Sequence, residues 1–216
     1  MSSNTDIHER WCRFKEFKDG GWDSWVSDYQ EIVNWVQEVR RKLKQTPDEP
    51  FPPSFLERLI LDKNNGISKS GRSHFTKSRF YRLSGSSEFC DVLRRLILNP
   101  TSACFRDFET AWRTHSGKGS DNPLLRNRCL AACTLRVSST VDRRSFEKLY
   151  KWCCKEKIIK GKPLANDWFK KNEFLLGQLH RQLEHELNEE EKKDRAFILN
   201  TFVWWLYKYD MPKAKS

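Results

Sequence analysis

The sequence has 216 residues, with 40 Lys and Arg against 29 Asp and Glu, which gives a formal net charge of +11 at pH 7. This length predicts one domain, or two small ones. Although only 38% of the residues are hydrophobic, 14 Phe, 9 Trp and 5 Tyr place much of that burial in large rings, which excludes disorder of the whole chain.

The first 50 residues predict a helical hairpin. Aromatic residues recur at three-residue steps over 11–17, and apolar residues recur at helical steps over 22–43. Two glycines separate these stretches, and four prolines at 46–53 predict a linker after them. We therefore assign 1–50 to an N-terminal hairpin with its linker and 51–216 to a helical domain, which could be continuous with the first.

The rest of the chain also has mainly helical periodicity. Helices are expected at 54–61, 76–83, 87–98, 101–115, 122–136, 142–153, 167–187 and 190–209. Ser54 with Glu57 predicts a capping box, Asp142 predicts an N-cap, and Asn166 or Asp167 predicts another. Because the β-branched stretch at 137–141 could be a strand or an extended connector, we predict a mainly α fold. It would be a compact multi-helix domain of roughly nine helices with at most a short strand pair.

No apolar run approaches the roughly 18 to 20 residues that a membrane-spanning helix needs, so no membrane partner is expected. The N-terminal ten residues lack the apolar stretch of a secretory signal, which favours a cytoplasmic protein. Seven cysteines without a C-x-x-C pair are typical of reduced intracellular thiols. Cys129 and Cys133 are one helical turn apart, and we interpret them as small apolar residues on a buried helix face rather than as metal ligands.

Basic residues are concentrated in two parts of the chain. Residues 63–82 include six basic and no acidic side chains, and residues 126–162 include eleven basic and three acidic ones. Cations and N–H donors on flexible backbone are what phosphate groups require, and the release of counterions drives such binding. We therefore predict contacts with the DNA phosphate backbone. The predicted contact residues are Lys69, Arg72, Ser73, Lys77, Arg79, Arg126, Arg128, Arg143, Arg144 and Lys148.

The two candidate catalytic motifs in the sequence lack the structural context that their chemistry requires. Residues 66–73 resemble a phosphate-binding loop with Arg72 in place of its lysine, but a helical pattern precedes them where a buried strand is required. The E-x-K triplet at 191–193 lies in an acidic helix start, where a nuclease would need a converging carboxylate pair. We therefore predict that the chain is not an enzyme and has no cofactor or metal site.

Several short strings resemble those of a known family. They are Asn65-Gly66-Ile67 followed by Gly71, Leu98-Asn99-Pro100, Asn127-Arg128 with Ala131-Ala132, Ser139-Thr140-Val141-Asp142 followed by Phe146, and Asp167-Trp168-Phe169 with Asn172. Together, over 56–206, they resemble the N-terminal region that precedes the motor in some McrB-like AAA+ NTPases of modification-dependent restriction systems. The resemblance implies an anti-phage DNA-specificity module, with modified bases as one class of target. Its partners would be an NTPase motor and a nuclease subunit.

Two alternatives remain open. A protein-interaction adaptor, acting in phage defence or in its inhibition, would use the basic surface to dock an acidic partner. RNA binding through the same cations and aromatic residues is a third, less favoured interpretation.

Overall fold

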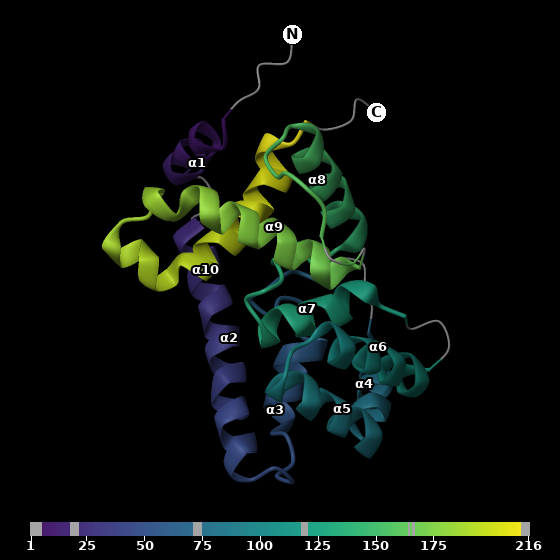
Figure 1. Cartoon of the computed structure of the whole chain (residues 1–216). Helices are drawn as coiled ribbons and strands as arrows, with labels where there is room; N and C mark the ends of the chain where they lie inside the picture. The colour runs from purple at the N-terminus through teal and green to yellow at the C-terminus, as the bar shows by residue number, and fades with distance from the viewer. Residues whose placement is uncertain are drawn as a thin grey trace. The chain divides into compact units, whose positions relative to one another are not determined.

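The computed structural model describes residues 6–17, 22–70, 75–117, 121–163, 165 and 167–212. Ten α-helices occur among them, with three short 3₁₀- or π-helical turns and no β-strand (Figure 1). The mainly α prediction is confirmed. Residues 137–141 form an irregular connector with bends rather than a strand, and an isolated bridge pairs Asn64 with Lys69.

The chain forms two units. One consists of Met1–Ser27 and Leu135–Ser216, and the other of Asp28–Thr134. The first boundary therefore falls inside the long helix α2 (Trp22–Gln45), whereas the sequence predicts either a division after residue 50 or one continuous domain. A regular apolar pattern along a helix does not indicate where its packing partners change, so this boundary could not be predicted from the periodicity.

The unit with both chain ends, which we call the terminal unit, is built from four helices. They are α1 (Ile7–Glu16), α8 (Arg143–Lys155), α9 (Trp168–Leu183) and α10 (Glu189–Trp205), with the short turns η2 (Glu184–Glu186) and η3 (Leu206–Asp210). Trp11 and Phe14 of α1 pack on Phe202 of α10, with ring centroids 5.1 and 5.2 Å away. Offset and edge-to-face rings of this kind stabilise a core beyond the area that they bury. Arg10 of α1 and Asp210 of η3 form a buried ion pair in the same unit.

The other unit, which we call the central unit, contains the remainder of α2 and five further helices. These are α3 (Pro53–Leu56), which continues as the π-helical turn η1 (Glu57–Leu61), then α4 (Lys77–Ser84), α5 (Ser87–Leu98), α6 (Ser102–Ser116) and α7 (Pro123–Cys133). Every residue of α7 from Leu125 to Cys133 is buried. A helix that is buried on all sides lies in the middle of its unit. The prediction that Cys129 and Cys133 are buried residues is therefore confirmed.

Side-chain caps define several helix starts. The side chains of Thr76, Ser86, Thr101, Asp142, Asp167 and Asn188 each accept a hydrogen bond from a backbone N–H three residues on. Asp142 and Asp167 were predicted as caps, and the alternative, Asn166, lies outside the described residues. The Ser54 prediction is wrong. There the helix begins at Pro53 without a side-chain cap, because proline has no N–H to satisfy and its fixed φ suits the first turn.

Within the described part of the chain, no helix is long and apolar enough to cross a bilayer. The same residues include no group of three or more His, Cys, Asp or Glu side chains arranged to hold a metal ion.

Candidate nucleic-acid interface

Helix α8 in the terminal unit presents a row of cations on its exposed face. Its start is fixed by Asp142, whose Oδ1 accepts a hydrogen bond from the Ser145 N–H at 2.8 Å. Apolar residues then bury one side of the helix, including Phe146, Leu149 and Cys153. The opposite side is left to solvent, so the long basic side chains there can extend freely.

Four exposed cations on that side form what we call the α8 stripe. They are Arg144, Lys148, Lys151 and Lys155. Steps of four, three and four residues keep side chains on one helix face. With a rise of 1.5 Å per residue, the stripe extends over about 16 Å. No member forms an ion pair with any residue that the structure describes.

The carboxylate nearest to the stripe along the helix is already neutralised. Glu147 receives hydrogen bonds from Lys171 Nζ of α9 at 2.8 Å to each of its oxygens. Because this pair is internal to the terminal unit, Glu147 offers the stripe little compensating charge. The exposed face of α8 is therefore strongly positive.

The turn after α8 adds three more exposed lysines, Lys157, Lys160 and Lys162. Two glutamines of α9 hydrogen-bond to the backbone of this turn. Gln182 Nε2 donates to the carbonyl oxygen of Ile158 at 2.8 Å, and Gln178 Nε2 donates to the carbonyl oxygen of Lys160 at 3.0 Å. These bonds anchor the backbone of the turn and leave its lysine side chains in solvent.

The predicted residues of this region divide between surface and interior. Arg144 and Lys148 belong to the α8 stripe, whereas Arg143 is partly buried and lies off its face. Lys151 and Lys155 were not among the predicted contacts. Their spacing from Arg144 and Lys148 is visible in the sequence and is the signal that could have identified them.

The central unit exposes a second, smaller basic surface on α4. Thr76 caps this helix, its Oγ1 accepting from the Arg79 N–H at 3.3 Å, while Phe80 and Leu83 are buried. Of the predicted contacts on this helix, Lys77 is exposed and Arg79 is partly buried. Arg82 and Tyr81 are also exposed, with Tyr81 at 59% the most exposed large apolar side chain described.

Lys69 is exposed on the loop before α4. Buried Asn65 shapes this loop, since its Oδ1 accepts from the Ile67 N–H at 3.1 Å and its Nδ2 donates to the Leu59 carbonyl at 3.2 Å. Gly66 has φ +87°, and a Cβ there would lie 2.3 Å from the Asp28 carbonyl oxygen, so only glycine fits. The predicted residues Arg72 and Ser73 lie outside the described residues.

Arg126 and Arg128 do not lie on a surface. Arg128 is fully buried and donates to the carbonyl oxygens of Ile60 at 2.6 Å, Asp62 at 2.7 Å and Ser68 at 3.3 Å. Burial lowers the pKa of its guanidinium from the ordinary value. These bonds tie α7 to η1 and to the loop that follows it.

Arg126 is 1% exposed and pairs with Glu109 of α6 at 3.2 Å and with Asp121. Since both guanidinium groups are enclosed and occupied within the central unit, we remove Arg126 and Arg128 from the predicted set of phosphate contacts.

Comparisons of the chain with models of protein families, with curated proteins and with solved structures found no match.

Proposed function

We propose that the chain is a non-catalytic DNA-binding module whose α8 stripe contacts the phosphate backbone. The observation that carries the proposal is the set of four exposed cations on one helix face, none paired with a described carboxylate. Each phosphate that such a cation neutralises releases condensed counterions, which favours binding independently of sequence. Four contacts would make log affinity fall by about 3.6 units per unit of log salt concentration.

The α4 surface is proposed as a secondary contact. Lys77, Arg82 and Tyr81 supply cations beside an exposed ring, a combination that suits phosphates and unstacked bases. Lys69 and Arg79 remain proposed contacts in this part of the chain, and Arg72 and Ser73, which lie outside the described residues, remain predicted contacts.

The biological setting proposed here follows from the sequence resemblance. A module of this kind would direct an NTPase motor and a nuclease subunit to phage DNA, with modified bases as one class of target. The proposal assigns no catalytic step, cofactor or metal to this chain, and it places the protein in the cytoplasm.

A filter-binding screen tests the proposal. The ligands are methylated and unmethylated duplex DNA, single-stranded DNA and RNA, all at low salt. The wild-type chain is compared with a variant in which Arg144, Lys148, Lys151 and Lys155 are all replaced by Gln, and with Lys42→Gln/Lys44→Gln as a basic-residue control on α2. We expect the wild type and the control to bind duplex DNA, and the stripe variant to lose most of its affinity.

Other outcomes would support the other functions. Preference for RNA over all three DNA ligands would favour RNA binding. Failure to bind any nucleic acid at low salt would contradict the proposal and favour an adaptor that docks an acidic protein, because the stripe's charge is also complementary to carboxylates.

A further inference from the structure

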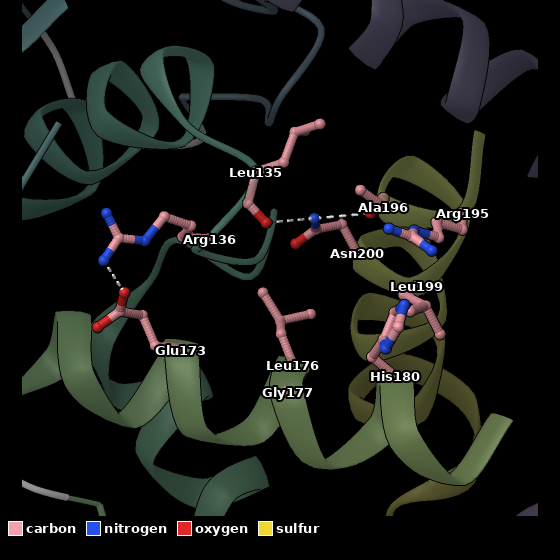
Figure 2. Close-up of a pocket in the computed structure, with 10 residues that line it drawn as sticks. All are labelled: Leu135, Arg136, Glu173, Leu176, Gly177, His180, Arg195, Ala196, Leu199 and Asn200. Carbon is pink, nitrogen blue, oxygen red and sulfur yellow. Dashed lines mark hydrogen bonds and ion pairs between the residues drawn. The ribbon is translucent and has the colours of Figure 1, made fainter. Parts of the chain in front are cut away.

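Helices α9 and α10 of the terminal unit border a hollow with a volume of about 280 Å³ (Figure 2). Leu176 of α9 and Ala196 and Leu199 of α10 supply apolar lining. Polar side chains border this apolar lining at two ends. Arg136 and Glu173 lie at one end, and His180 and Arg195 lie at the other. The amide of Asn200 extends from α10 between the two ends. Apolar walls with a few convergent polar groups are the usual composition of small-molecule sites.

The hollow is lined by a residue whose buried acceptor has no hydrogen-bond partner among the described residues. Asn200 is 1% exposed, and its Nδ2 donates to the carbonyl oxygens of Ala196 at 2.8 Å and Leu135 at 3.2 Å. Because both neighbours are acceptors, the amide nitrogen must face them, and this fixes the direction of Oδ1. Asn200 Oδ1 is buried with no hydrogen-bond partner among the described residues. Buried polar atoms in this condition are uncommon in native proteins.

His180 adds a second group of the same kind. Its Nε2 atom is also buried and has no hydrogen-bond partner among the described residues. His180 and Asn200 both line the hollow, and a molecule bound there could supply the hydrogen bonds that these two atoms lack among the described residues.

The charge at the hollow favours an anion. Glu173 is already engaged by two cations, Arg136 and Lys170, the latter at 2.7 Å. Arg195 is exposed at the rim and forms no ion pair with a described residue. A guanidinium group can bind a carboxylate or phosphate through two parallel hydrogen bonds.

Gly177 gives independent support. It lies within α9, where glycine is unfavourable because it has the largest backbone entropy to lose. A Cβ added there would meet no atom within 4 Å, so packing does not require glycine at this position. Its absent side chain instead leaves more room in the hollow that it lines.

From these features we propose that the α9–α10 hollow binds a small organic anion that carries a hydroxyl or amine donor. The anionic group contacts Arg195 and His180, the donor reaches Asn200 Oδ1, and the body of the ligand packs on Leu176 and Leu199. A volume of about 280 Å³ suits a single-ring acid. The hollow contains no residue of the α8 stripe, so a failure of the DNA-binding proposal would leave this proposal unaffected.

The test uses three related probes, meta-hydroxybenzoate, benzoate and meta-hydroxybenzyl alcohol. Binding to the full chain is followed by chemical-shift changes of the histidine imidazole and backbone amide signals during titration. We expect meta-hydroxybenzoate to bind most tightly, because benzoate lacks the donor and the alcohol lacks the charge. Shifts should centre on His180 and Asn200. Absence of saturable binding by all three probes at millimolar concentrations would overturn the proposal.

Two pairs of variants localise the site. Arg195→Ala should weaken binding of meta-hydroxybenzoate by about tenfold or more, whereas Lys193→Ala, which removes an exposed cation from the same helix without lining the hollow, should leave affinity unchanged. Gly177→Leu should abolish binding by filling the space, while Gly177→Ala reduces it less. Equal effects of Arg195→Ala and Lys193→Ala would reveal attraction to net charge alone and would contradict the proposed site.

Discussion

Helices α7 and α8 contain basic residues of the same predicted cluster, yet they use them in opposite ways. In α7 of the central unit, Arg126 and Arg128 are buried and their guanidinium groups bind carboxylates and main-chain carbonyls. In α8 of the terminal unit, Arg144 and Lys148 lie in solvent with no described ion-pair partner. The difference shows that a local excess of positive charge does not by itself identify a binding surface.

The physical distinction lies in the apolar pattern around each charge. α8 has apolar residues on one face only, so its cations occupy the other face. In α7 the two arginines flank buried Asn127 and are followed by the buried apolar or small run Cys129–Cys133, so α7 has no exposed face for them. Arginine tolerates such a position because its planar guanidinium offers five donors that can satisfy several buried carbonyls at once.

The largest effect is expected from Arg128→Met. The substitution keeps an extended side chain but leaves the carbonyls of Ile60, Asp62 and Ser68 without their donor. We expect the free energy of unfolding to fall by about 3 kcal/mol or more, measured by urea denaturation with tryptophan fluorescence. Arg144→Met on α8 is the matched control and should change it by less than about 0.5 kcal/mol. Equal effects of the two variants would remove the contrast between the helices.

An effect that is smaller per pH unit is expected through Cys129, which lies beside Arg128. Burial raises the pKa of this thiol from 9.0 to about 12 in the folded chain. Above pH 9 the unfolded chain releases this proton while the folded chain retains it, so the thiol's contribution to stability is complete below pH 9 and is lost progressively towards pH 12. The expected slope is about 1.4 kcal/mol per pH unit in that interval.

Urea unfolding measured from pH 7 to the alkaline range checks this prediction. Cys129→Ala should flatten the alkaline decline by the contribution of one thiol, whatever its effect at neutral pH. If the free energy of unfolding has the same pH dependence in the variant and the wild type, burial does not keep the Cys129 thiol protonated in the folded chain.

The helix starts provide the smallest test. Asp142→Ala removes the side-chain cap of α8 and should cost about 1 kcal/mol of stability, measured by thermal unfolding with circular dichroism. Asp142→Asn retains an acceptor and should cost less. Asn122 stands at the corresponding position of α7 but makes no side-chain cap bond, so Asn122→Ala should be milder than Asp142→Ala. The reverse order would contradict our account of what holds each helix start.

Much of the helical architecture was predictable because its signals are local. Asp142 was recognised as a cap from its position before an apolar pattern, and the structure confirms it. Ser54 gave a similar signal, but Pro52 and Pro53 initiate the helix instead. The division into two units was not predictable in this way, because it depends on which helices pack together rather than on the pattern within one helix.

The candidate sites divide along the same line. The α8 stripe follows from residue spacing, and its extension to Lys151 and Lys155 could have been predicted. The burial of Arg128 could not, because its carbonyl partners lie 60 or more residues earlier in the chain. The hollow between α9 and α10 likewise arises from tertiary packing. The local feature of the sequence that points to it is Gly177, a glycine within a helical pattern.

The most direct measurement of the central claim is the salt dependence of duplex DNA binding by three chains, the wild type, Lys148→Gln/Lys151→Gln and Lys42→Gln/Lys44→Gln. If the α8 stripe contacts phosphates, the slope of log affinity against log salt concentration should become shallower by about 1.8 for the Lys148 and Lys151 variant, and it should stay at the wild-type value for the α2 control. A slope that is the same in all three chains would contradict the assignment of the stripe as the DNA-binding surface.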